Sequence, residues 1–225
     1  MMTPFSIALD GPSGAGKSTI AKALATELGA VYLDTGAMYR AIGLYMKRLG
    51  ICEAAAAVSA RVTEAPLSVR HIGDTQHVFL NDEDVSELIR QPEVSMLASA
   101  MGAIPAVRSH LVDLQREIGT RTSIVMDGRD IGTVVLKDSP CKIFLTAASE
   151  ERARRRYVQQ LAKGDNTPYE QVLRELIARD EQDMNRKTDP LRQAEDAVLV
   201  DSTEMTEAET VEAIVKIVEE VYGKQ

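Results

Sequence analysis

Short apolar runs recur along the chain, and longer segments with helical spacing separate them. The runs predict buried strands at 6–10, 30–33, 122–126, 141–145 and 197–200. The main helices are predicted at 17–28, 37–49, 105–119, 149–162 and 169–185, with a last one from 206. Apolar positions at helical spacing mark the helix at 37–49 and the last one. This alternation is typical of a parallel sheet with helices on both faces, so we expect an α/β fold with five parallel strands.

One segment departs from this alternation. Between about 66 and 86, two short runs, 67–70 and 77–80, flank Gly73 and Asp74, a pattern that favours a β-hairpin. Helical patterns at 92–103 and 105–119 follow before the strand–helix alternation returns. We therefore expect a small β-rich subdomain inserted into the α/β chain.

The first predicted strand leads directly into a glycine-rich loop. The loop and the start of the next helix consist of Gly11, Pro12, Ser13, Gly14, Ala15, Gly16, Lys17, Ser18 and Thr19. The spacing G-x-x-x-x-G-K-[ST] between a strand and a helix is that of the phosphate-binding P-loop. Glycines let successive N–H groups point at one anion, and the helix N-terminus adds its positive dipole end. Lys17 can reach the β- and γ-phosphates and Ser18 can hold Mg²⁺, so we expect a nucleoside-triphosphate site.

A second candidate group follows the strand at 122–126. Asp127 resembles the carboxylate that steadies Mg²⁺, directly or through water, opposite the P-loop hydroxyl, although it could simply cap the next turn. Arg129 and Asp130 in the same turn could grip a polar acceptor. Ligands of parallel sheets bind at the carboxyl ends of the strands, where this turn is expected.

A third candidate group follows the strand at 30–33. Thr35 would cap the next helix, and its hydroxyl and the neighbouring N–H groups could accept a phosphate. Arg40, about one turn along, could bind the same phosphate. The alternative is an ordinary helix cap with a solvent-facing arginine.

Arginines crowd two later helices. The helix at 149–162 opens with a capping-type Ser149 and carries Arg152, Arg154, Arg155 and Arg156. The first, third and fourth of these share a helical face and should repel one another until an anion binds. One face of the next helix carries Arg179, Asp183 and Arg186. Charge-rich helices are commonly solvated, but mobile arginines closing over a P-loop would neutralise the charge of phosphoryl transfer and exclude water.

Composition narrows the function further. The net charge of −8 argues against sequence-independent binding to nucleic acid. Cys52 and Cys141 fit no metal or redox spacing, and we see neither a signal peptide nor a membrane-spanning run, so we expect a cytoplasmic protein. The three histidines are isolated and form no catalytic triad, which leaves positioning and electrostatics as the means of catalysis.

Taken in order, these motifs closely resemble the bacterial-type cytidylate kinases of the nucleoside monophosphate kinase superfamily. The resemblance covers the whole chain and rests on the P-loop, the run Asp34-Thr-Gly-Ala-Met-Tyr-Arg40, the turn Asp127-Gly-Arg-Asp130 and the arginine-rich helix. It implies a core at 1–34 and 104–225, a monophosphate-binding subdomain at 35–103 with the β-rich insert, and a lid at about 150–168. It also implies a monomer that transfers the γ-phosphate of ATP to CMP or dCMP with Mg²⁺.

The resemblance also implies roles for individual residues. Those matching positions that hold the acceptor phosphate are Thr35, Arg40, Arg129 and Arg186. Those matching positions that read the cytosine edge are Ser99, Arg108 and Asp130, while Tyr39 flanks the base and Arg179 and Asp183 contact the sugar. The residues implied in catalysis are Lys17, Arg129, Arg186, Arg155 and Arg156, the last two in the lid. Thr35 replaces the serine of some relatives and keeps the hydroxyl.

Physical chemistry supports cytidine as the acceptor. A carboxylate such as Asp130 can accept from the exocyclic amine of cytosine but would face the carbonyl of uracil with an unpaired charge. Two other functions stay open: a kinase of UMP, AMP or a hydroxy acid on the same fold, and a nucleotide-dependent switch. Guanine-nucleotide switches need an N-K-x-D segment, whereas the nearest run here, 185–189, has the order Asn-Arg-Lys-Thr-Asp. The insert could in addition be a surface for a partner protein.

Overall fold

The central sheet places all the predicted strand ends at one edge. The computed structural model describes residues 4–223, apart from the side chains of Pro92 and Ser95. Within this part of the chain, five parallel strands have the order β2-β6-β1-β7-β8. They are β1 (Ser6–Asp10), β2 (Val31–Asp34), β6 (Ile124–Gly128), β7 (Cys141–Thr146) and β8 (Val198–Asp201). The predicted α/β class and its five parallel strands are confirmed.

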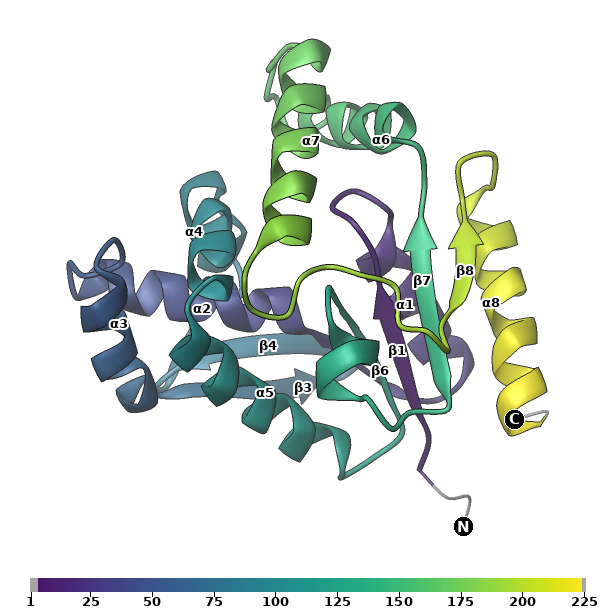
Figure 1. The fold of residues 1–225 in the computed structure, drawn as a ribbon, viewed down its shortest axis with the longest axis horizontal. Helices are drawn as coiled ribbons and strands as arrows, with labels where there is room; N and C mark the ends of the chain where they lie inside the picture. Colours follow the sequence, from purple (N-terminus) through teal and green to yellow (C-terminus); the bar gives the residue numbers. More distant parts are fainter. Residues whose placement is uncertain (1–3, 224–225) are drawn as a thin grey trace.

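Helices cover both faces of this sheet (Figure 1). On one face, α1 (Lys17–Glu27) and α8 (Glu207–Tyr222) bury Leu24 and Ile214 against Ile7 and Leu9 of β1. On the other face, α2 (Thr35–Arg48), α3 (Ala55–Arg61) and α5 (Pro105–Gly119) pack with Ala8 in a second core cluster. Alternate residues of β1 thus face opposite helix layers, which explains why its three central residues, Ile7, Ala8 and Leu9, are all apolar.

The β-rich insert forms a second, antiparallel sheet. Its strands are β3 (Leu67–Ile72), β4 (Thr75–Leu80) and the two-residue β5 (Glu83–Asp84), with Gly73 at φ +60° in the predicted turn. The sheet packs on α2 through a third core cluster that includes Leu44 and Val78. It is also tied to the end of β2, because the Gln76 side chain accepts from the Asp34 N–H at 2.7 Å and donates to the Asp34 carbonyl at 3.2 Å.

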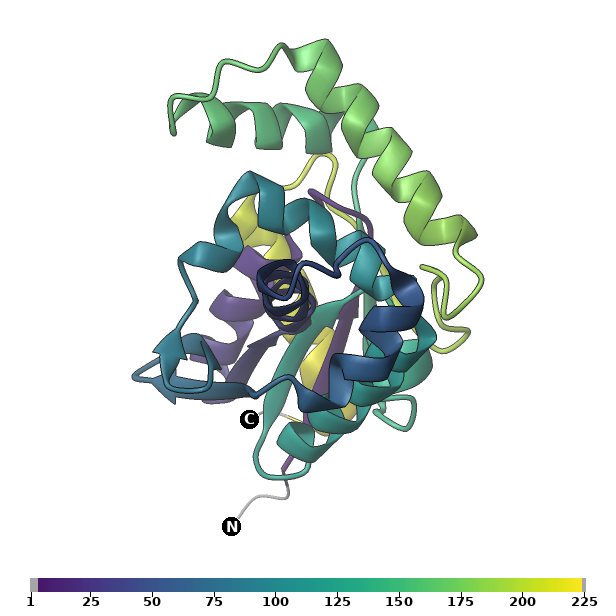
Figure 2. The same cartoon turned by 90° about the vertical axis from the view of Figure 1, so that its left-hand side faces the viewer.

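Three helices stand around the carboxyl edge of the main sheet. They are α4 (Pro92–Gly102), which packs on α2, and α6 (Ser149–Leu161) and α7 (Tyr169–Asn185), which lie together above the strand ends (Figures 1 and 2). The expected cap of α6 is wrong: Ala148 holds the N-cap position without a side-chain cap, and the Ser149 hydroxyl accepts from Arg152 instead. Short helical turns complete the chain: η1 (Val62–Glu64), η2 (Leu88–Arg90) and the π-helical turn η3 (Ile131–Val135).

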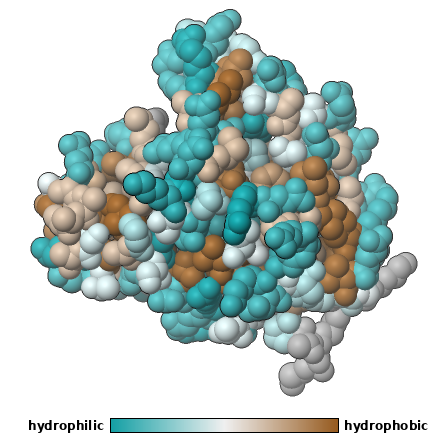
Figure 3. Space-filling view, in the orientation of Figure 1, coloured by the Kyte–Doolittle hydropathy of each residue, from teal (hydrophilic) through white to brown (hydrophobic). Residues whose placement is uncertain are grey.

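The surface is mostly hydrophilic. Figure 3 shows several apolar patches on this face, and one of them lies over the edge strand β8, where Val198 and Leu199 are exposed. No helix in residues 4–223 is both long enough and apolar enough to span a bilayer.

Candidate active site

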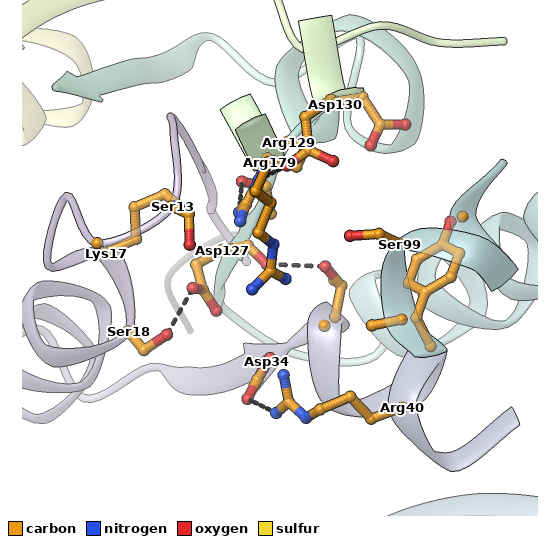
Figure 4. A pocket seen from close by; sticks show the side chains of 18 of the residues that line it. Ser13, Lys17, Ser18, Asp34, Arg40, Ser99, Asp127, Arg129, Asp130 and Arg179 are labelled. Carbon is orange, nitrogen blue, oxygen red and sulfur yellow. Dashed lines mark hydrogen bonds and ion pairs between the residues drawn. The ribbon is translucent and has the colours of Figure 1, made fainter. Parts of the chain in front are cut away.

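A cavity of about 360 Å³ at the carboxyl edge of the sheet brings together most of the predicted site residues. The predicted residues that line it are Ser13, Gly14, Gly16, Lys17, Ser18, Thr19, Thr35, Tyr39, Arg40, Ser99, Arg108, Asp127, Arg129, Asp130, Arg155, Arg156, Arg179, Asp183 and Arg186. Those that do not line it are Gly11, Pro12 and Ala15 of the P-loop. Lys17 and Ser18 lie on one side and Ser99 on the other, with Asp127 and Arg179 between them (Figure 4).

The P-loop is shaped by its glycines and closed by its lysine. A Cβ on Gly11 would lie 1.9 Å from the Leu145 carbonyl oxygen, so only glycine fits there. The Lys17 ammonium donates to the Pro12 carbonyl at 2.7 Å across the loop. Burial, reinforced by Arg129, lowers the pKa of Lys17 to about 7. Gly16 caps α1 without any side chain, so the first N–H groups of the helix are left for an anion.

The carboxylate opposite the P-loop is buried, and each of its two oxygens accepts one hydrogen bond. Asp127 accepts from the Ser18 hydroxyl at 2.8 Å and from the Tyr32 hydroxyl at 2.9 Å. Burial, with Asp34 adding to it, raises the pKa of Asp127 to about 6. Because its carboxylate points at the P-loop serine, Asp127 does not serve as a cap of the following turn.

The predicted capping role of Thr35 is wrong. Asp34 is the N-cap of α2 and accepts from the Ala37 N–H at 2.9 Å, while Thr35 is the first helical residue. The Thr35 hydroxyl instead donates to the Asp127 carbonyl at 2.8 Å and joins β2 to β6. Asp34 also pairs with Arg40 at 2.8 Å, which holds this arginine at the cavity wall.

Two cavity arginines keep unused donors. Among the described residues, the buried Nε atoms of Arg40 and Arg179 have no hydrogen-bond partner. Burial, together with the positive charge of Arg129, lowers the pKa of Arg179 to about 10. Buried donors without partners are costly, so this part of the cavity is suited to an anion.

Beyond these arginines lies a network of buried charges. Asp130 accepts from Arg108 through one carboxylate oxygen and from Arg186 at 3.2 Å through the other. Arg108 also pairs with Asp189 at 2.7 Å, and its guanidinium lies 5.8 Å from the centre of the Tyr39 ring. Burial raises the pKa of Asp130, while the two arginines oppose that shift.

The arginines of α6 do not act as one group. Arg152 is buried and donates to the Ser13 carbonyl at 2.9 Å and to Asp180 at 2.5 Å, so it braces the P-loop and does not face the cavity. The expected repulsion on one face is therefore relieved by a carboxylate of α7. Arg155 pairs with Glu151 at 2.9 Å, and exposed Arg156 lines the cavity.

Sequence reasoning missed several cavity residues. These are Ala98, Gly102 and Gln159, while Asp34, Gly36 and Gly128 stood in the candidate motifs but were given no role of their own. Gln159 lies one helical turn after Arg156, so helical spacing was a usable signal for it. Gly102 and Ala98 carry no chemistry in their side chains, and only the packing of α4 brings them to the wall.

The P-loop serine is bonded to a buried carboxylate at the end of a strand, beside a cavity lined by arginines. In a parallel sheet with helices on both faces, this arrangement defines a P-loop nucleotide-binding protein of the phosphotransferase class. The family model for cytidylate kinase matches residues 7–220, and the chain belongs to that family. It is 49% identical to the cytidylate kinase of Mycobacterium leprae over 99% of each chain. It is 45% identical to that of Caldicellulosiruptor saccharolyticus over the full length of both. An uncharacterized protein from Eubacterium ventriosum, 15% identical with a TM-score of 0.54 over 96% of this chain and 98% of that one, shares the fold.

Proposed function

We propose that the chain transfers the γ-phosphoryl group of ATP to CMP or dCMP, giving ADP and CDP or dCDP. Membership of the cytidylate kinase family supports the reaction class and nucleotide substrates. The observation that carries the proposal is that one cavity joins a P-loop to Ser99, Arg108 and Asp130, which offer donors and an acceptor to a pyrimidine edge.

The donor nucleotide reaches the P-loop from a second cavity. This cavity of about 860 Å³ shares Gly16, Thr19, Arg155 and Gln159 with the first and extends along the loop at 202–207. In our proposal the donor nucleoside lies there, and its phosphates run over the P-loop N–H groups to Lys17. Adjoining cavities suit a direct transfer, because the two reacting phosphates meet where the cavities join.

Ser18 and Asp127 suit a magnesium ion that arrives with the donor phosphates. Mg²⁺ binds hard oxygen ligands and commonly uses one or two side chains together with phosphates and water. A hydroxyl and a carboxylate 2.8 Å apart supply such oxygens, and the described residues contain no cluster of three or more metal-binding side chains. When bound, the ion would neutralise charge on the transferred phosphate. The Tyr32 hydroxyl holds the Asp127 carboxylate in the orientation that this requires.

The acceptor phosphate lies among the cavity arginines in this proposal. Thr35, Arg40, Arg129 and Arg186 hold it in line with the donor, and the unused donors on Arg40 and Arg179 support an anion there. Lys17, Arg129 and Arg186, with Arg155 and Arg156 of α6, offset the charge that develops on the phosphoryl oxygens. Arg179 and Asp183 bind the sugar, and Tyr39 flanks the base.

Cytosine is favoured at the far end of the cavity. Asp130 accepts from the exocyclic amine in our proposal, and Arg108 donates to the neighbouring ring acceptors. Arg108 and Arg186 both pair with Asp130 and favour its charged form, against the effect of burial, which raises its pKa. Uracil would present a carbonyl to that charge, which is the physical reason for discrimination.

The proposal divides the chain into three parts. Residues 1–34 and 104–225 are the core, residues 35–103 hold the acceptor, and residues 150–168 act as a lid that brings Arg155 and Arg156 over the phosphates. We further propose a monomer, because the sequence carries no coiled-coil pattern. Light scattering after size exclusion should give the mass of one chain.

The test is ADP production with Mg-ATP and a panel of acceptors: CMP, dCMP, UMP, AMP, shikimate and none. Turnover confined mainly to CMP and dCMP would support the proposal. Rapid turnover with another acceptor would keep the reaction class and overturn the cytosine assignment. Slow hydrolysis that ignores the acceptor would instead indicate a nucleotide-dependent switch.

A further inference from the structure

We propose that Asp189 is a positioning residue that holds Arg108 and Arg186 in place for the acceptor nucleotide. Asp189 follows α7 and contacts both arginines, and it is not among the described residues that line the cavity. It therefore acts through its neighbours and not by touching substrate. The inference rests on the proposed function, because it assumes that Arg108 and Arg186 bind the acceptor.

Asp189 makes one contact to each arginine, through two different groups. Its carboxylate accepts from Arg108 Nε at 2.7 Å, and its backbone carbonyl accepts from Arg186 Nε at 2.6 Å. Asp130 contacts the same two arginines from the cavity side, through one Nη atom of each. The four residues thus form a closed ring in which each arginine is held at both ends of its guanidinium.

This arrangement decides which donors of Arg108 face the acceptor. The Arg108 side chain is only 2% exposed, and its Nη1 lies 3.5 Å from the Gly102 carbonyl. With Nε bound to Asp189 and Nη2 to Asp130, the guanidinium plane is fixed, and rotation about its bond to the chain is prevented. A fixed donor plane loses less conformational freedom when a planar base binds, so acceptor affinity should depend on it.

The backbone at Asp189 is unusual and makes both contacts possible. Asp189 has φ +46°, and among described residues other than glycine only Asn81 shares a positive φ. The residue before a proline normally avoids helical conformations, and Pro190 follows directly. Aspartate and asparagine tolerate the left-handed region better than other side chains. The turn directs the carboxylate to Arg108 while the carbonyl points to Arg186.

The experiment compares Asp189→Gly and Asp189→Asn with the unaltered protein in steady-state assays that vary CMP and ATP separately. Glycine keeps the positive φ, and with it the carbonyl contact to Arg186, but removes the carboxylate. Asparagine also keeps φ and offers Arg108 a neutral acceptor. The matched control is Asp196→Asn, which also removes one negative charge from an ion pair. Asp196 pairs with the buried Lys142, but its own side chain is 64% exposed.

We expect Asp189→Gly to raise KM for CMP about tenfold, the size expected when a charge-assisted hydrogen bond is lost. KM for ATP and kcat should stay within about twofold, the asparagine variant should be intermediate, and the control should be unchanged. A merely structural turn would give a glycine variant with normal KM for CMP, and general loosening would raise both KM values equally; either result overturns the inference. An unaltered protein that does not phosphorylate CMP overturns the proposed function as well.

Discussion

Breaking the buried pair that braces the P-loop should destabilise the protein strongly, and Arg152→Met tests this. Arg152 Nη1 lies 2.5 Å from Asp180 Oδ2, and the two side chains are 6% and 8% exposed. Arg152 also donates to the Ala147 and Ser13 carbonyls, while Asp180 accepts from the Ser13 N–H at 3.2 Å. Methionine keeps the apolar stem but leaves Asp180 buried with a single weak donor.

We expect this substitution to lower the free energy of unfolding by about 3 to 5 kcal/mol, the usual effect of breaking a buried pair. Urea unfolding followed by circular dichroism measures that change at pH 7. The matched control is Arg154→Met on the same helix, where the side chain is 63% exposed and pairs with Glu151. Exposed ion pairs contribute little to stability, so the free energy of unfolding of the control should be close to that of the unaltered protein.

A double variant separates the ion pair from general damage to α6. Arg152→Met with Asp180→Leu removes both charges, and it should lose less stability than Arg152→Met alone because no buried charge is left unpaired. About 1 to 2 kcal/mol should remain lost, because the Ser13 N–H and carbonyl lose their partners. An Arg152→Met change no larger than that of the control, or strict additivity in the double variant, would refute the reasoning.

Three further predictions concern buried titratable groups. Lys17→Met should lower kcat about 10³-fold. It should not lower the thermal midpoint, because burial already disfavours the positive charge of Lys17. Full turnover would contradict the P-loop assignment. Asp130→Asn should lower the ratio of kcat/KM for CMP to kcat/KM for UMP about tenfold. An unchanged ratio would show that Asp130 does not take part in base recognition. Burial raises the pKa of Asp10 from 3.8 to about 6, so the native state binds a proton at a pH where the unfolded chain has lost it. Stability from this group is therefore greatest below pH 4 and falls as the pH rises to 6. Relative to Asp10→Asn, the unaltered protein should lose roughly 2 kcal/mol between pH 4 and 7, and parallel curves would contradict the raised pKa.

The fold was predictable because local pattern and tertiary structure agree. Each predicted strand of the main sheet lies within two residues of an observed one, and the hairpin at Gly73 forms where its turn signal lies. Because parallel strands end at one edge, residues far apart in the chain could be assigned to one site before their contacts were known. Asp10, Asp34 and Asp127 illustrate this, since the paired strands β1, β2 and β6 carry them at that edge.

The predictions that failed concerned residues whose contacts come from distant segments of the chain. Helical spacing places Arg152 beside Arg155, but only the packing of α6 on α7 supplies Asp180 and buries the pair. Thr35 has the right residue type for a cap, yet Asp34 takes that position, and Thr35 bonds to Asp127 on a neighbouring strand. Asp189 gave no signal, because its role depends on a left-handed backbone and on an arginine 81 positions earlier.

The balance of charge in the cavity explains how an acidic protein binds polyanions. Among the described residues, eight cationic side chains and four carboxylates line it, in a chain of net charge −8. The carboxylates Asp34, Asp130 and Asp183 each pair with a cavity arginine and fix its position. The surplus of positive charge then suits a triphosphate and a monophosphate together, because each phosphate restores pairing that the protein alone does not complete. The rest of the chain carries a net negative charge, which should disfavour contact with a nucleic-acid backbone, so the distribution of charge, and not its sum, suits small nucleotides.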